Sequence, residues 1–385
     1  MTAAEIVDAA AREPVLVFGS LPPEGRDLDL LTRDPEPIAA ALRREGFVSR
    51  GAHEWARFAH CSVEAVDLTT DWPHRDELLA DVRPVDPFAR LVRPSPAHSL
   101  LLLAQMLARQ GRYPWKRVAR MRAALAEDSD AAEAAQRLAP AWGVADELER
   151  VLAGEPVVPR PRPRRPRVIA VSGIDGSGKS TQARALCETL ELLGYDAVVA
   201  WAPLGSSRLL RKLFLPVRDA LGRVTGFQQP AAAADSALVP NPGSLLRERS
   251  PVANFAWSAL VALTNGAFHA RTVARESARG RVVIFDRYVL DSVVRLRFLY
   301  GDRPHRVQNA IVRRLSPRPR AAFFLDVAAE SSRARKNDRW TLADLHTLVR
   351  LYREELPRDV TRLDGERPRD ELCAEIAEAA WRRLG

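Results

Sequence analysis

The segment Gly173–Ser180, GIDGSGKS, constrains the fold of this chain more than any other part of the sequence. It matches the pattern GxxxxGK[ST], follows the apolar run Val168–Ser172 directly, and precedes an amphipathic stretch that runs from Lys179 to Gly194. Glycines let the backbone curl tightly, so that its N–H groups turn inward, and the N-terminus of the following helix adds a partial positive charge. The sequence therefore predicts a strand, a phosphate-binding loop and a helix, in that order.

The side chains of this loop indicate how a nucleotide would be held. Lys179 is expected to reach the β- and γ-phosphates of ATP, and the Ser180 hydroxyl is expected to bind Mg²⁺. Lysine is rare in this chain and arginine is common, so a compact ammonium group at this position supports the assignment. The predicted ATP-binding residues are Gly173, Asp175, Gly176, Ser177, Gly178, Lys179, Ser180 and Thr181.

The second half of the chain alternates strand-like and helical patterns. After Val168–Ser172, further apolar runs occur at Asp196–Trp201, Arg281–Asp286 and Ala321–Val327, with helical patterns between them. Nearly continuous apolar strands are typical of a parallel sheet that is covered by helices on both faces. We therefore predict an α/β fold for this half.

Two charged segments follow two of these strands. Asp286, at the end of RVVIFD, is placed to organise Mg²⁺ at the phosphate edge of the sheet, and Arg287 suits an acceptor phosphate. Arg335 and Arg339 belong to the basic run ESSRARKNDRW, which could act as a lid over the transferred phosphoryl group. A strand-end ion pair and a solvated helix face are the structural alternatives. The predicted catalytic residues are Lys179, Asp286, Arg287, Arg335 and Arg339.

Taken together, GIDGSGKST, FDRYVLDS, and LDV followed by the arginine-rich run resemble the thymidylate kinase family, from about Arg167 to the C-terminus. The resemblance implies a P-loop NTPase fold and an ATP- and Mg²⁺-dependent phosphotransferase of the nucleoside-monophosphate-kinase type. It places Asp175 near the acceptor's sugar and Asp286-Arg287 near its phosphate, so the implied acceptor-binding residues are Asp175, Arg287 and Tyr288. The phosphate loop has no arginine between its glycines, which resembles the members that use a lid arginine.

The chain departs from this family in its acceptor-binding segments. The family usually has an arginine before the proline that ends its second strand, whereas Ala200–Ser207 reads AWAPLGSS. A second arginine is missing from Leu263–Phe268, and the Ala-, Pro- and Arg-rich segment from Arg208 to Pro251 has no equivalent in the family. We therefore predict that thymidylate is a poor acceptor, and a non-nucleotide metabolite stays open as an alternative.

The Pro- and Arg-rich segment 154–167 predicts an extended linker between a domain at 1–153 and the kinase-like domain at 168–385. In the first domain Gly19-Ser20 ends a strand and Asp27 and Asp29 follow, which resembles the nucleotidyltransferase superfamily that includes DNA polymerase β. Alternating carboxylates on one strand share a face and can hold Mg²⁺. Asp67 is the expected third carboxylate, with Glu64 as second choice. The resemblance implies a small α+β domain with a helical tail, and a plain surface turn is the alternative.

Composition limits the environment and the partners of the chain. Cys61, Cys187 and Cys373 lie far apart, which argues against disulfides and zinc and for a reducing compartment, so we expect a cytoplasmic protein. No segment has the length and apolarity of a membrane span. The formal charge of +9 could indicate nucleic acid, but the basic linker lacks aromatic residues that stack on bases. A small-molecule acceptor is the expected partner; a homodimer and an ATP-switched, nucleic-acid-associated binding protein stay open.

Overall fold

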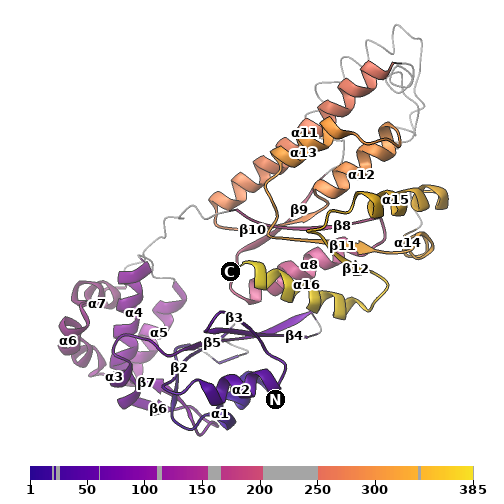
Figure 1. Cartoon of the computed structure of the whole chain (residues 1–385). Helices are drawn as coiled ribbons and strands as arrows, with labels where there is room; N and C mark the ends of the chain where they lie inside the picture. The colour runs from indigo at the N-terminus through magenta and orange to yellow at the C-terminus, as the bar shows by residue number, and fades with distance from the viewer. Residues whose placement is uncertain are drawn as a thin grey trace. The chain divides into compact units, whose positions relative to one another are not determined.

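The computed structural model describes residues 1–19, 21–22, 27–59, 61–110, 115–154, 166–202, 250–336 and 340–384, and only the backbone at 110 and 115–120. Ser20, Arg339, most of the predicted linker and the segment 203–249 lie outside these ranges. The chain forms two compact units, one made mainly of residues 1–162 and the other mainly of residues 163–385 (Figure 1). In the described part of the chain, no helix combines the length and apolar character needed to cross a membrane.

The second unit is built on a five-stranded sheet with the order β12-β11-β8-β10-β9, in which every pair of neighbours is parallel. The prediction of an α/β fold with a parallel sheet is therefore confirmed, and this sheet is consistent with a P-loop kinase fold. Its strands are β8 (Arg167–Gly173), β9 (Ala197–Trp201), β10 (Val282–Asp286), β11 (Ala321–Asp326) and β12 (Thr361–Asp364). Because parallel strands end at the same edge, the segments that follow β8, β10 and β11 meet there.

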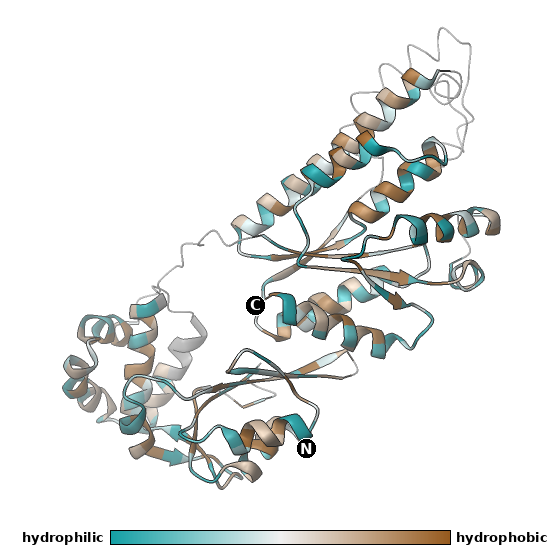
Figure 2. Cartoon of the chain, viewed as in Figure 1, coloured by the Kyte–Doolittle hydropathy of each residue, from teal (hydrophilic) through white to brown (hydrophobic). Residues whose placement is uncertain are grey.

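Helices cover both faces of this sheet, with α8 and α16 on one face and α11, α12 and α15 on the other (Figure 1). Hydrophobic residues fill the strands between the two helical layers (Figure 2), and β10 is buried along its whole length. The helices are α8 (Lys179–Leu192), α11 (Pro251–Ala278), α12 (Val289–Tyr300), α13 (Arg306–Leu315), α14 (Ala329–Arg335), α15 (Leu342–Glu355) and α16 (Arg369–Leu384).

The first unit contains a mixed seven-stranded sheet with the order β3-β4-β5-β2-β1-β7-β6. The pairs β2–β5 and β1–β7 are parallel and the other pairs are antiparallel. Its strands are β1 (Val15–Val17), β2 (Leu28–Leu31), β3 (Val48–Arg50), β4 (Glu54–Ala59), β5 (Ser62–Thr69), β6 (Val82–Pro84) and β7 (Leu91–Pro94). Its helices are α1 (Ala3–Ala10), α2 (Glu36–Arg44), α3 (Arg75–Ala80), α4 (Pro96–Gln110), α5 (Trp115–Glu127), α6 (Ala131–Trp142) and α7 (Ala145–Leu152).

The two faces of this mixed sheet bury different residues. Leu28, Leu30, Val66 and Leu68 share one hydrophobic core with α1 and α2. Residues of the other parity, such as Leu16 and Leu31, contribute to a second core with α4, α6 and α7. An α+β unit with a helical tail, as the sequence predicts, is therefore observed.

Candidate active site

The phosphate loop joins the central strand β8 to helix α8. Gly176 and Gly178 have φ angles of +82° and +88°, which are in the region where glycine is favoured over other residues. A Cβ atom at Gly176 would also lie 2.7 Å from the backbone oxygen of Ser332, so the loop can approach α14 closely only because this residue is glycine. The conformation of the loop thus depends on its glycines and on its close contact with α14, where the basic segment begins.

Lys179 is buried at the beginning of α8, with 4% of its surface exposed. Its Nζ donates to the backbone oxygen of Ile174 at 2.9 Å and lies 3.4 Å from Oδ1 of Asp175. Burial, and then the positive charge of Arg287, lower the pKa of Lys179, while the nearby carboxylates oppose this shift. The backbone of the phosphate loop therefore holds the ammonium group of Lys179 within the loop.

Ser180 connects the start of α8 to the end of β10. Its Oγ donates to Oδ2 of Asp286 at 2.5 Å, while Oδ1 of Asp286 is buried and has no hydrogen-bond partner among the described residues. Hydroxyl and carboxylate oxygens are ligands that Mg²⁺ accepts, and this ion commonly uses few protein ligands together with phosphate oxygens and water. No group of three or more His, Cys, Asp and Glu side chains in the described ranges could hold a metal by itself. Ser180 and Asp286 therefore fit a Mg²⁺ ion that is bound together with a nucleotide.

The side chain of Asp175, within the phosphate loop, contacts three other residues of the site. Its Oδ1 pairs with Arg287 and Lys179, and its Oδ2 accepts a hydrogen bond of 2.9 Å from Nε1 of Trp340. Burial alone would raise the pKa of Asp175, but Arg287, Lys179 and the Trp340 hydrogen bond together hold it below its ordinary value. The same ion pair raises the pKa of Arg287 against the opposing effect of burial. The cationic neighbours therefore favour the ionised form of Asp175.

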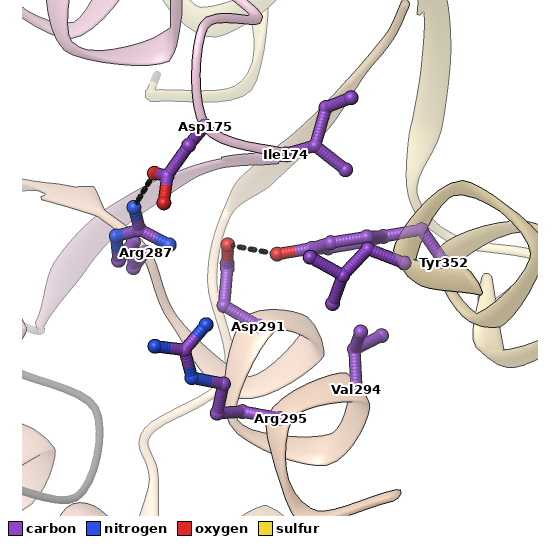
Figure 3. A pocket seen from close by; sticks show the side chains of 8 residues that line it. Ile174, Asp175, Arg287, Asp291, Val294, Arg295 and Tyr352 are labelled. Carbon is purple, nitrogen blue, oxygen red and sulfur yellow. Dashed lines mark hydrogen bonds and ion pairs between the residues drawn. The ribbon is translucent and has the colours of Figure 1, made fainter. Parts of the chain in front are cut away.

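Beside Asp175 lies a pocket whose labelled side chains come from the phosphate loop, the DR-tyrosine segment, α12 and α15 (Figure 3). Asp291 is fully buried in its wall, where its Oδ1 accepts from the hydroxyl of Tyr352 at 2.7 Å and its Oδ2 accepts from the backbone N–H of Tyr288 at 3.0 Å. The pocket is lined by Ile174, Asp175, Arg287, Asp291, Val294, Arg295, Leu348 and Tyr352.

The structure separates the three residues expected at the acceptor. Asp175 and Arg287 line the pocket together, whereas Tyr288 is 1% exposed and packs in the core with Phe285 and His269. The Tyr288 hydroxyl donates to the backbone oxygen of Pro317 at 2.6 Å. Tyr288 therefore does not line the pocket, and it acts on the pocket wall only through its backbone N–H, which donates to Asp291.

The basic segment is only partly described. Arg335 donates to the backbone oxygen of Gly365 at 3.1 Å and pairs with Glu366 at 3.0 Å, and it does not line the pocket. Arg333 donates to the backbone oxygen of Trp340. Thr181 lies exposed in the first turn of α8. In this arrangement Arg335 is engaged with the loop that follows β12 rather than with the phosphate loop.

Sequence reasoning missed Asp291, Arg295, Trp340 and Tyr352. Asp291 and Arg295 lie four residues apart on α12 and therefore share a helix face. A helix predicted directly after the DR-tyrosine segment would have indicated both residues as neighbours of Arg287. Trp340 and Tyr352 enter from later segments, and no local pattern marks them as neighbours of Asp175 and Asp291.

In the first unit, three acidic residues form a row across neighbouring strands. Asp29 on β2 is paired in register with Asp67 on β5, and Asp67 is paired in register with Glu54 on β4. Paired residues point to the same face of a sheet. Burial, then repulsion from Glu54, raises the pKa of Asp67, and Asp27 adds to the repulsion. Gly19 follows β1, as the sequence predicts. Glu64, the second choice for the third carboxylate, forms an ion pair with Arg57 instead.

The parallel sheet and its glycine-rich loop are consistent with a P-loop kinase fold. The chain is 27% identical over 189 residues to a probable thymidylate kinase of Pyrococcus horikoshii, which covers 48% of this chain and 77% of that protein. It is 25% identical over 226 residues to a thymidylate kinase of Leptospira interrogans, covering 56% and 94% of the two chains. A shorter match, 51% identical over 49 residues, occurs with a thymidylate kinase of Ruegeria pomeroyi, covering 12% and 23%. No protein-family model matches the chain.

Proposed function

We propose that residues 168–385 form an ATP- and Mg²⁺-dependent phosphotransferase of the nucleoside-monophosphate-kinase type. The observation that carries this proposal is the convergence of Lys179, Ser180, Asp286 and the Asp175–Arg287 pair at one edge of the parallel sheet. The similarity to thymidylate kinases over about half of the chain supports the same class of reaction.

In this proposal the phosphate loop binds ATP. The inward N–H groups of Gly173–Ser180 and the N-terminus of α8 attract the phosphate oxygens, and Lys179 neutralises charge on the β- and γ-phosphates. Ser180 and Asp286 would hold Mg²⁺, which neutralises phosphate charge when it is bound. An incoming anion would compete with Asp175 for the ammonium group of Lys179, which lies 3.4 Å from that carboxylate.

The pocket next to the loop would bind the acceptor. An acceptor oxygen attacks the γ-phosphorus, the bond between that phosphorus and the β–γ bridging oxygen breaks, and ADP leaves. Asp175 and Arg287 would orient the acceptor, because both line the pocket. Asp175 belongs to the phosphate loop, and Arg287 is ion-paired with it. Arg335 and Arg339 are proposed to stabilise the transferred phosphoryl group. For this, Arg335 would have to break its ion pair with Glu366 and bind the phosphoryl group instead.

A second proposal concerns residues 1–153, joined to the kinase by the linker at 154–167. The in-register pairing of Asp29 with Asp67, and Gly19 after β1, support a nucleotidyltransferase-like domain. Because no three acidic side chains of the described residues could hold a metal by themselves, Asp27, Asp29 and Asp67 would bind Mg²⁺ together with the phosphates of a nucleotide. Adding Mg²⁺ and a nucleoside triphosphate should then raise the unfolding temperature of the first unit in the full-length wild type but not in an Asp29→Asn/Asp67→Asn variant. Equal responses of the two proteins would count against cation binding at these carboxylates.

The test of the kinase proposal is ADP formation by the full chain with a panel of acceptors. The panel should contain nucleoside monophosphates, including dTMP, the matching nucleosides, and hydroxylated metabolites without phosphate. We expect ADP formation that depends on both Mg²⁺ and an acceptor, with dTMP among the poorer acceptors. ATP binding without acceptor-dependent turnover over the whole panel would favour an ATP-switched binding protein instead.

A further inference from the structure

The peptide group between Asp175 and Gly176 lies in the turn of the phosphate loop, where α14 contacts it. Ser332 on α14 is 1% exposed, and its hydroxyl donates a hydrogen bond to the backbone oxygen of Asp175. A trans peptide group is planar, and its N–H points to the side opposite its C=O. The bond from Ser332 therefore turns the N–H of Gly176 away from α14. This N–H has no backbone acceptor among the described residues.

The preceding carbonyl group of the loop is also bound to donors of the protein. The backbone oxygen of Ile174 accepts from Nζ of Lys179 at 2.9 Å and from the N–H of Ser177 at 3.2 Å. A carbonyl oxygen that faced a phosphate would repel its negative charge, whereas an N–H attracts it. Holding the carbonyl groups of Ile174 and Asp175 on protein donors therefore favours a loop that presents N–H groups to an anion.

Glycine at position 176 does not by itself hold this peptide group in one orientation. Gly176 has a φ angle of +82°, and glycine adopts positive and negative φ angles about equally readily. If the peptide group turned over, the carbonyl oxygen of Asp175 would take the place of the N–H of Gly176. A larger residue cannot replace this glycine, because its Cβ would lie 2.7 Å from the backbone oxygen of Ser332. The Ser332 hydroxyl thus supplies a restraint that the loop sequence lacks.

Helix α14 is a fixed support for this hydrogen bond. The N–H of Ser332 donates to the backbone oxygen of Ala328 at 3.0 Å, within the first turns of the helix. The next residue, Arg333, donates to the backbone oxygen of Trp340, and Nε1 of Trp340 donates to Oδ2 of Asp175 at 2.9 Å. Asp175 is therefore held at its carbonyl by Ser332 and at its carboxylate by Trp340.

We propose that Ser332 is a positioning residue for the nucleotide, because its hydroxyl keeps the N–H of Gly176 turned toward the phosphates of bound ATP. This role rests on the proposed function, in which the phosphate loop binds ATP. Ser332 acts through the peptide group of Asp175 and Gly176 and does not itself contact the nucleotide. Part of the affinity for nucleoside di- and triphosphates thus depends on α14, outside the phosphate-loop motif.

The test compares Ser332→Ala with Ser331→Ala in the full chain. Ser331 is the neighbouring residue on α14, is only partly buried, and makes no side-chain hydrogen bond with a described residue, so it is the matched control. Calorimetric titration with ADP and Mg²⁺ measures nucleotide binding without phosphate transfer. We expect Ser332→Ala to raise the Kd for ADP and the KM for ATP about 5- to 20-fold, with the acceptor KM unchanged within about twofold. Ser331→Ala should resemble the wild type.

Ser332→Cys separates the hydrogen bond from the packing at this position. A thiol is bulkier than a hydroxyl and is a weaker donor. If the hydroxyl acts by donating to Asp175, Ser332→Cys should bind ADP with an affinity between those of the wild type and Ser332→Ala. The reverse order, with alanine tolerated better than cysteine, would overturn the positioning role in favour of packing. The rise in unfolding temperature that ADP produces is the second readout, because it reports nucleotide binding rather than the stability of the free protein.

The results for Ser332 and for the proposed kinase can be told apart. If Ser332→Ala binds ADP as tightly as Ser331→Ala, the positioning role fails while phosphate transfer by the wild type stands. If Ser332→Ala shows the expected loss but the wild type transfers phosphate to no acceptor, the positioning role stands and the kinase function fails. If the wild type binds neither ADP nor ATP, both fail.

Discussion

Both units place carboxylates on a sheet, but the surroundings shift the pKa of these carboxylates in opposite directions. At the edge of the parallel sheet, Asp175 is met by Arg287, Lys179 and Trp340, and its pKa is lowered. On the mixed sheet, Asp67 stands in register with Asp29 and Glu54, and its pKa is raised. A carboxylate compensated by cations, as at this edge, suits a site for anionic substrates, whereas a carboxylate whose pKa is raised by burial and repulsion, such as Asp67, suits a cation or costs stability. Glu54 in this row is itself paired with Arg50. The same residue type therefore indicates different chemistry in the two units.

Apart from the loss of Lys179, the largest effect is expected at the compensated edge, from Asp286→Asn. Loss of the carboxylate charge beside Ser180 should lower phosphate transfer by about 100-fold or more, since this charge organises the Mg²⁺ site. Asp364→Asn, an exposed substitution at the end of β12, is the matched control. Turnover of Asp286→Asn equal to that of the control would remove Asp286 from the catalytic residues.

Buried histidines extend the comparison of the two units. His98 in the first unit lies 3.0 Å from Asp81 and 3.4 Å from Glu77, whereas His269 in the second unit meets the Ser316 hydroxyl at 2.8 Å and aromatic rings. Burial lowers the pKa of His269 to about 4 from its ordinary value of 6.5. The unfolded chain therefore binds a proton between pH 6.5 and pH 4 that the folded chain does not.

His269 should accordingly destabilise the second unit in mild acid. As the pH falls from 6.5 to 4, the free energy of unfolding should drop by about 3 kcal/mol more in the wild type than in His269→Gln. Urea unfolding of the full chain measures this difference, in the transition that ATP stabilises. His346→Gln changes an exposed histidine and should keep the wild-type pH dependence. Parallel pH profiles for wild type and His269→Gln would show that His269 is charged in the folded protein.

The smallest effects concern the carboxylates themselves and have opposite signs in the two units. At pH 7, Asp67→Asn should stabilise the first unit by about 0.5–1 kcal/mol, because it relieves burial and repulsion of a charge whose pKa is raised. This gain should shrink as the pH falls, since protonation relieves the same charge in the wild type.

Asp175→Asn should destabilise the second unit. The pKa of Asp175 is lowered in the folded protein, so its contribution is present above the unfolded pKa and is lost as the pH falls through the folded one. Unfolding curves at several pH values measure both substitutions. Equal signs for Asp67→Asn and Asp175→Asn would contradict the contrast between the two units.

Local signals account for the part of the structure that the sequence predicts. The strand, loop and helix around Gly173–Ser180 and the apolar strand ending at Asp286 depend on spacing and hydrophobicity within short windows, and the observed parallel sheet agrees with them. The resemblance carried by FDRYVLDS also implies that Tyr288 contacts the acceptor. In the structure, the Tyr288 ring is buried in the core and its hydroxyl donates to the backbone oxygen of Pro317, an arrangement that satisfies both the apolar ring and its polar group.

The remaining pocket residues needed the tertiary structure. Tyr352 meets Asp291 across 61 residues, and Trp340 meets Asp175 across 165 residues. Neither contact follows from a period or a motif, because both depend on how α12, α15 and the segment before α15 pack on the sheet. The in-register pairing of Asp29 with Asp67 also required the strand order, since a shift of one residue would turn Asp67 to the other face.

Phosphate transfer at the compensated edge of the parallel sheet depends, in this proposal, on the ammonium group of Lys179, so Lys179→Met is the decisive variant. Methionine keeps the buried apolar stem but removes the ammonium group, and Arg184→Ala on the exposed side of the same helix serves as the control. With ATP labelled in its γ-phosphate, we expect labelled acceptor from the wild type and from Arg184→Ala. We expect about 1,000-fold less from a folded Lys179→Met variant, which lacks the ammonium group at the phosphates. Labelled acceptor formed at the wild-type rate by folded Lys179→Met would rule out phosphate transfer at this edge.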